Sequence, residues 1–242
     1  MTILRAAAIS ALLLSSAACG IGVHAKDSGP AVDRAYAIGA FTKIAVAGPY
    51  EVTVNAAGKP GVTAHGGSKL LDETIVEVVN GELRIHTREH HGFNWGWHSD
   101  GKTTLVVSGA SAVSEAAIAG SGGIHLDRAA GPSFKGSVAG SGDLNVAALD
   151  AQTAELGIAG SGDIRVAGKA GSAKLDIAGS GDIDTPALQT VDSTISIAGS
   201  GNVRAHATRT ASVTVLGSGD VTLTGGAKCT VEKHGSGNVN CS

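Results

Sequence analysis

Along the second half of the chain, apolar and polar residues alternate on both sides of a short Gly-Ser-Gly step. In the segment Leu156–Val166, apolar residues stand at every second position up to the step and again after it. Strand side chains point alternately to opposite faces, so this alternation predicts two short strands joined by a corner at the glycines. One face of each strand is expected to be buried and the other exposed.

The step recurs seven times, at intervals of 18 to 20 residues. Its first glycine lies at Gly120, Gly140, Gly160, Gly179, Gly199, Gly217 and Gly235. The position four residues after this glycine is apolar in every copy, and the position two before it is apolar in all but the last, as in Ile164 and Ile158. A strand pair of this kind cannot bury its apolar face alone, but stacked copies can. The repeat therefore predicts a solenoid whose coils share one apolar interior.

The expected fold class is all-β: a right-handed parallel β-helix or β-solenoid with coils of about 18–20 residues and a less regular N-terminal β region. A propeller of four-stranded blades needs about 40 residues per repeat, twice this interval. Collagen is excluded because glycine does not occupy every third position. We expect one domain over residues 41–242, with N-terminal strands over 41–107 and the Gly-Ser-Gly repeats over 108–242.

The first 25 residues have the pattern of an export signal, in which Arg5 precedes the apolar run Ala6–Ala18. The run is shorter than the roughly 20 residues of a transmembrane helix. Two outcomes remain open: cleavage after Ala25, or lipidation of Cys19, which would anchor the chain to a membrane. Both place the protein outside the cytoplasm, in the periplasm, at the outer membrane or on the surface of a bacterium. Residues 26–40 are expected to form a flexible tether.

An acidic or amide residue follows the corner in six of the seven copies, and Gly123 takes its place in the first. This acidic turn ladder comprises Asp143, Asp163, Asp182 and Asp220, with Asn202 and Asn238 in the same column. Asp, Asn and Ser side chains bind turn backbone, so we expect the ladder to cap the corners. The alternative is a row of cations, but calcium-binding β-roll repeats have a nine-residue period that this chain lacks.

The densest group of aromatic and histidine residues lies between the two regions. It contains the ligand-contact candidates Phe93, Trp95 and Trp97, and the weak metal candidates His86, His90, His91 and His98. The three aromatic residues alternate, so on a strand they would share one face that stacks on a sugar or a partner, or covers the end of the solenoid. No metal site is predicted, because the histidines show no regular ligand spacing.

Cys229 and Cys241 lie six residues before and six residues after the last corner glycine, in columns that otherwise hold inward-facing residues. In an oxidising compartment this pair predicts a disulfide across one corner of the final coil. Two buried free thiols are the alternative. Lys233 and His234 in the same coil replace an inward apolar residue and an alanine, as expected for a polar terminal cap.

Composition and short motifs mainly exclude functions. The net charge of −3 gives no electrostatic footprint for nucleic acid. No Gly-x-Ser-x-Gly elbow and no nucleotide-binding loop is present, and no cofactor is predicted. The chain is therefore expected to be non-catalytic. A carbohydrate-active β-helix enzyme, a polysaccharide lyase or hydrolase, is the alternative, since a glycosidase needs two carboxylates about 5–9.5 Å apart and the acidic turn ladder has that order of spacing.

Three features occur in a characteristic order: the segment Phe41–Gly48, the segment Asn80–Ile85 and the Gly-Ser-Gly ladder. In this combination the chain resembles the bacterial family described as putative auto-transporter adhesin, head GIN domain. The resemblance covers about residues 41–239. It implies an exported β-helix-like domain without established enzymatic activity, and it supplies no catalytic residues. The expected function is a rigid surface for binding or adhesion in the cell envelope, with an envelope or surface partner such as a glycan.

Overall fold

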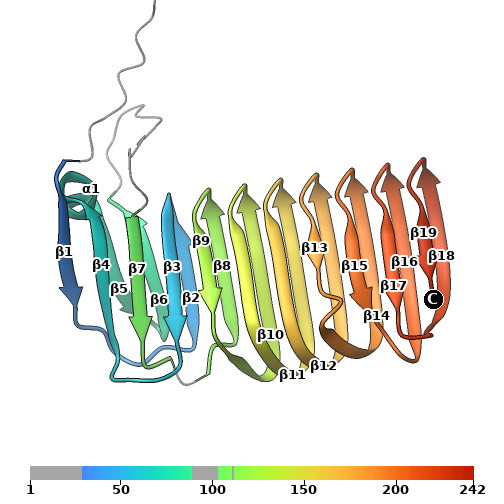
Figure 1. The fold of residues 1–242 in the computed structure, drawn as a ribbon, viewed down its shortest axis with the longest axis horizontal. Coiled ribbons are helices and arrows are strands. Elements are labelled where there is room, and N and C mark those ends of the chain that lie inside the picture. The colour runs from blue at the N-terminus through green and yellow to red at the C-terminus, as the bar shows by residue number, and fades with distance from the viewer. Residues whose placement is uncertain (1–28, 89–102, 111) are drawn as a thin grey trace, which may run out of the picture.

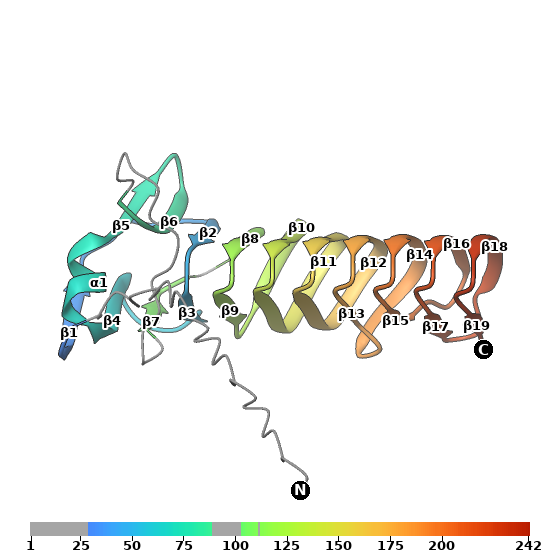
Figure 2. The same cartoon turned by 90° about the horizontal axis from the view of Figure 1, so that it is seen from above.

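The structure of the 242-residue chain is a computed structural model that describes residues 29–88, 103–110 and 112–242. Of the described residues, 70% are in strands and 3% are in a helix, and together they form a β-solenoid (Figure 1). The expected β-solenoid is confirmed. Figures 1 and 2 together show the chain rising on the far face and descending on the near face as it advances towards its C-terminus, which is a right-handed winding.

Each repeat, here called a rung, has an extended segment before the corner and another after it. β11 and β12 each run from one corner to the next, so each contributes to two rungs. The regular rungs are built from β8 (Glu115–Gly120), β9 (Gly123–Leu126), β10 (Ala129–Gly140), β11 (Asp143–Gly160), β12 (Asp163–Gly179), β13 (Ile183–Asp184), β14 (Leu188–Gly199), β15 (Val203–His206), β16 (Thr210–Gly217), β17 (Val221–Thr224), β18 (Lys228–Gly235) and β19 (Val239–Cys241). Equivalent strands pair in parallel and in register: Val138 pairs with Ile158, which pairs with Ile177. All three are at most 3% exposed, so the columns predicted from the repeat line one interior.

The N-terminal rungs are stacked in an order that differs from the order of the chain. β2 (Lys43–Ala47) lies between β6 (Glu82–Thr87) and β8, and β3 (Tyr50–Asn55) lies between β7 (Thr103–Ser108) and β9. The β2–β3 rung is therefore inserted between the later β6–β7 rung and the regular repeats. Its corner contains Gly48, whose φ of 125° matches the corner glycines although the sequence there is not Gly-Ser-Gly.

An antiparallel layer closes the N-terminal end. β1 (Ala31–Tyr36) pairs with β4 (Gly61–Gly67), which pairs with β7, and the helix α1 (Ser68–Glu73) follows β4. β5 (Thr74–Val79) forms a hairpin with β6 through Asn80 and Gly81, both at positive φ, as the sequence predicts. Figure 2 shows this hairpin projecting away from the row of rungs.

β1 lies inside the range 26–40 that was expected to be a tether. Residues 31–36 instead form a strand, because every residue of β1 has a register partner on β4. Val32 and Tyr36, four residues apart and so on the same face of the strand, pack against the apolar interior. The alternation that marks this strand spans only three side chains, too few to stand out in the sequence.

Tyr50 closes the apolar interior next to this layer. It occupies the corner position that a glycine holds in the regular rungs, and its side chain is fully buried. The Tyr50 hydroxyl lies 3.0 Å from Thr74 Oγ1, which itself donates to the Leu70 carbonyl at 2.7 Å, so Tyr50 is the donor. Burial raises the pKa of the Tyr50 phenol above its usual value of 10.0. A buried phenol whose hydrogen bond is satisfied can therefore cap the interior without an unpaired polar group.

Both corner glycines lie against the backbone of the preceding rung, and the first is constrained by its backbone conformation as well. The first has positive φ, for example 139° at Gly179, a conformation that side chains disfavour. The second lies directly on the rung before it: a Cβ at Gly181 would be 2.0 Å from the Gly162 carbonyl oxygen. No side chain fits there while the rungs keep their spacing.

We expect Gly181→Ala to lower the free energy of unfolding by at least about 2 kcal/mol, because the added methyl must push two backbones apart. Gly157→Ala is the matched control, since a Cβ there meets nothing within 4 Å and its φ is ordinary. Urea unfolding of the two variants checks this prediction. Equal stability of both variants would show that the rungs do not approach as closely as the structure has them.

Candidate functional site

The solenoid presents two outer faces of different chemistry. We call the outward positions three and five residues after the corner glycine the polar face, and those one, three and five residues before it the small-residue face. The polar face carries the acidic turn ladder and a neighbouring column that includes Asn145, Arg165, Asp184 and Arg204. Because every rung repeats the same strand register, equivalent positions form straight columns. Successive residues within a column are about 4.8 Å apart.

The acidic turn ladder is bound to the backbone. Asp182 Oδ1 accepts hydrogen bonds from the Asn202 backbone N–H at 2.8 Å and from Asn202 Nδ2 at 3.0 Å. Asp220 Oδ1 likewise accepts from the Asn238 backbone N–H at 2.7 Å, and the Asp182 backbone N–H donates to Asp163 Oδ1 at 3.3 Å. Each of these Asp side chains thus receives the backbone N–H of the next rung.

The charged groups of the polar face are largely paired with one another. Arg204 binds both carboxylate oxygens of Asp184, at 2.9 and 2.7 Å, and this hydrogen bonding raises the pKa of Arg204 above its usual value. Arg165 binds Asp163 at 2.8 Å. These ion pairs join neighbouring columns and neighbouring rungs, so carboxylates at glycosidase-like spacing are engaged as structural acceptors.

A second kind of ion pair joins β14 to the loop that precedes β16. Asp192 accepts hydrogen bonds from the Arg209 guanidinium and from the Thr210 hydroxyl. These hydrogen bonds hold the pKa of Asp192 at about 2, below its usual 3.8, and the bond from Arg209 has the largest effect. The carboxylate is therefore ionised at any physiological pH and serves to fix the loop.

A polar depression of about 380 Å³ interrupts the ladder at Gly123, which lacks the side chain found in the other rungs. Glu51 and Asp143 lie on either side of this gap, and Arg165 and His125 also line it. The depression offers hydrogen-bond donors and acceptors to a polar ligand.

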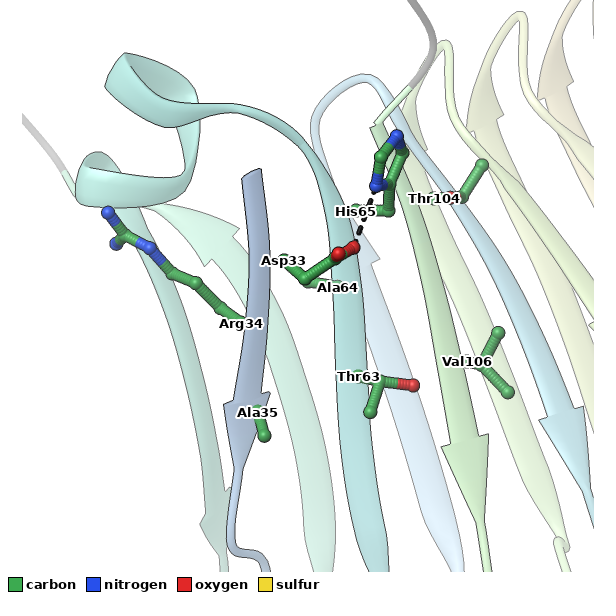
Figure 3. Close-up of a pocket in the computed structure, with 8 residues that line it drawn as sticks. All are labelled: Asp33, Arg34, Ala35, Thr63, Ala64, His65, Thr104 and Val106. Carbon is green, nitrogen blue, oxygen red and sulfur yellow. Dashed lines mark hydrogen bonds and ion pairs between the residues drawn. The ribbon is translucent and has the colours of Figure 1, made fainter. Parts of the chain in front are cut away.

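A second depression, of about 420 Å³, lies on the outer face of β1, β4 and β7 (Figure 3). His65 Nδ1 is 2.7 Å from Asp33 Oδ1, and Thr104 is the register partner of His65 on the next strand. The Asp33 and His65 side chains are 88% and 61% exposed, so water competes for both. Arg34 points away from this pair and binds the Leu71 carbonyl at 2.8 Å. This group could not be predicted from the sequence, because its members come from three separate segments that only the pairing of β1, β4 and β7 places side by side.

The metal and aromatic candidates fall mostly outside the described residues. Cys19, Phe93, Trp95, Trp97, His90, His91 and His98 lie there. His86 is described: its Nδ1 lies 3.1 Å from the Thr87 carbonyl oxygen and its Nε2 lies 3.9 Å from Glu77. Within the described ranges, no group of three or more His, Cys, Asp and Glu side chains is arranged to hold a metal ion.

The last rung carries a disulfide between Cys229 on β18 and Cys241 on β19, as predicted. It joins the strands on either side of the final corner. Lys233, at an inward position of the same rung, donates to the Gly237 carbonyl at 2.8 Å. The last described rung is therefore covalently closed and carries a charge on its outer strand, a feature that discourages edge-to-edge strand pairing.

We compared the chain with known protein families. The sequence model of the family described as putative auto-transporter adhesin, head GIN domain, matches residues 40–227. The chain belongs to this family. Membership suggests an extracellular or cell-surface location. No curated protein sequence matches the chain.

Solved structures of similar fold include proteins described as putative adhesins and one described as a putative lipid binding protein. A putative adhesin from Bacteroides fragilis is 19% identical, with a TM-score of 0.80 over 89% of this chain and 99% of the other. A putative adhesin from Parabacteroides distasonis is 15% identical, with a TM-score of 0.72 over 89% and 99%. A protein from the same species described as a putative lipid binding protein is 23% identical, with a TM-score of 0.70 over 89% and 98%. At these identities the likeness is one of fold.

Among the described residues, no helix has the length and apolar character to cross a membrane.

We expect Asp182→Ala to lower the free energy of unfolding by about 1 kcal/mol, because the Asn202 N–H loses its acceptor. Asp182→Asn is the matched variant: it keeps an oxygen acceptor, and Asn already stands in this column at position 202, so a smaller loss is expected. Chemical denaturation measures both. An Asn variant as unstable as the Ala variant would contradict the capping role.

Reduction of the disulfide is expected to remove up to about 3 kcal/mol of stability, since the bond closes a loop with a sequence separation of 12. The loss should begin locally, as faster hydrogen exchange in β18 and β19 while β11 keeps its protection. The double variant Cys229→Ala/Cys241→Ala should show this pattern without reductant and no further response to it. A uniform change along the solenoid would contradict the terminal role of the bond.

Proposed function

We propose that this protein is an exported, non-catalytic domain of the cell envelope that presents its outer surface for binding or adhesion. The observation that carries this proposal is the engagement of the acidic turn ladder. The carboxylates that a polysaccharide lyase or hydrolase would use accept hydrogen bonds from the backbone of the next rung or pair with Arg165 and Arg204. Activity would require these groups to be free to exchange protons with a substrate.

Export is supported by the charged and apolar pattern of the first 25 residues and by the disulfide, a bond that persists in oxidising compartments. The family description and the fold of the structural neighbours are consistent with an adhesin-like head. Rigidity also suits this role, because a preformed surface loses little conformational entropy when it binds.

The segment that we propose as the ligand-contacting part is residues 89–102, with Phe93, Trp95 and Trp97. It connects β6 to β7, a connection that the equivalent strands of the other rungs make with a short corner. An aromatic-rich insertion of this length at one corner is not needed to continue the solenoid. Aromatic rings bind the apolar faces of sugars and protein side chains at low entropic cost.

We expect Trp95→Ala/Trp97→Ala to weaken binding to glycan arrays or to intact cells by at least tenfold, with unchanged thermal stability. The control is Trp95→Phe/Trp97→Phe, which keeps aromatic faces and should retain most of the binding. Polysaccharide turnover that disappears in Asp182→Asn while the fold persists would overturn the non-catalytic proposal and favour the enzyme. Binding that is equal in the Ala and Phe variants would move the contact surface away from this segment.

A further inference from the structure

The small-residue face has an unusual composition for an exposed sheet. From the β2 rung to the last rung, its column one residue before the corner is exposed and reads, in spatial order, Ala47, Ala119, Ala139, Ala159, Ala178, Ala198, Leu216 and His234. Exposed strand positions normally favour β-branched, aromatic or polar residues, and alanine is depleted there. Six consecutive alanines therefore call for a reason other than strand formation.

Folding does not require alanine in this column. Leu216 and His234 occupy the same register position in later rungs, so the backbone leaves room for large side chains. Leu216 is 50% exposed. This column therefore changes from small side chains in its first six positions to large ones in its last two.

The flat end holds an apolar depression of about 350 Å³. Its outward lining consists of Ala45, Ala47, Ala117, Ala119, Ser137 and Ala139, with Arg84 and His86 of β6 at one side. Figure 2 shows the β5–β6 hairpin standing out from the row of rungs at this end, so the depression lies in an inner corner of the molecule. The exposed Leu216 lies on the same face and in the same column, five rungs away, or about 24 Å at ~4.8 Å per rung.

We propose that two copies of this chain pair through their small-residue faces, antiparallel to each other, with Leu216 of each copy in the apolar depression of the other. A two-fold axis along the strand direction, between β11 and β12, keeps every column opposite itself and reverses the order of the rungs. The β8 rung then faces the β16 rung of the second copy, so Ala119 meets Leu216 twice. A knob and a hole related in this way make an isologous, closed contact.

The charges on the face fit the same arrangement. The column five residues before the corner reads Lys43, Glu115, Lys135, Glu155, Lys174, Thr194, Ser212 and Thr230. At the two-fold axis Glu155 faces Lys174 of the second copy, and the same pair forms again by symmetry. The other Lys and Glu residues of this column face Thr or Ser, so no like charges face each other within it.

The column three residues before the corner is also compatible with this pairing of the two copies. Gly157 faces Asp176 of the second copy, so the smallest residue of the face meets an acidic one. Glu232 of the last rung faces Ala45, one rung from Arg84. The projecting hairpin beyond Arg84 limits how far the second copy can slide in that direction and so helps to fix the register.

The available area is sufficient. Eight rungs at ~4.8 Å and three outward columns about 17 Å across give about 650 Å² per copy, or about 1,300 Å² in total. This lies within the range of about 1,200–2,000 Å² for specific interfaces. The pairing is independent of the surface-binding role, because a dimer can form whether or not the protein binds a surface.

Sedimentation velocity of the chain purified from a host that exports it tests the proposal over micromolar to millimolar concentrations. We expect a concentration-dependent dimer, and Ala119→Arg should weaken it at least tenfold by filling the depression. The control is Asn145→Arg on the polar face, in a column that already contains Arg165 and Arg204, which should dimerise like the wild type. A wild-type chain that stays monomeric, or an Ala119→Arg variant that is folded and dimerises normally, overturns the proposal.

Cysteine cross-linking tests the register separately. In the proposed dimer position 119 lies opposite position 216, whereas two copies of position 119 are about 24 Å apart. The double variant Ala119→Cys/Leu216→Cys should therefore form disulfide-linked dimers under mild oxidation, and each single variant should not. Single variants that cross-link as well as the double variant would overturn the antiparallel arrangement. Neither assay contains a surface ligand, so failure here leaves the binding proposal untouched.

Discussion

The close approach of one corner backbone to the next is the constraint on which the rest of this structure depends. The second glycine of each corner lies so near the carbonyl of the preceding rung that no Cβ fits. This contact sets the position of each rung relative to the last and leaves no freedom to slip by a residue. Since a one-residue slip would turn every apolar side chain outward, the corner glycines and the apolar columns specify the same register.

This repetition also determines what the outer faces can do. In a regular column each polar side chain has an equivalent neighbour one rung away, and the Asp and Asn residues after the corner are engaged with that neighbour's backbone. Chemistry specific to this protein is therefore to be sought where a column is broken. Gly123 opens a polar depression, Tyr50 closes the apolar interior, Lys233 caps the edge and Leu216 raises the small-residue face.

The sequence was sufficient for those features that repeat. Seven aligned copies predict which side chains point inward, and the same alignment places Cys229 and Cys241 across one corner, where the disulfide is found. It was insufficient for the N-terminal end, where β1 is too short to show a clear alternation and the β2–β3 rung is stacked out of chain order. The group of Asp33, His65 and Thr104 could not be predicted for a similar reason. Pairing among β1, β4 and β7 brings together three segments that no sequence periodicity relates.

The charges on the small-residue face explain why the inserted rung lies where it does. In spatial order, the column five residues before the corner begins Glu82, Lys43, Glu115, Lys135, Glu155 and Lys174, alternating in sign at every step. Lys43 forms an ion pair with Glu115 at 2.9 Å. If the rungs were stacked in chain order, Glu82 and Glu115 would be neighbours, and like charges directly opposite each other destabilise a sheet. Each such pair is worth only about 0.2–1 kcal/mol, far less than the burial of the apolar columns. Burial therefore drives the formation of the solenoid, while the row of alternating charges favours this order of rungs over another with the same interior.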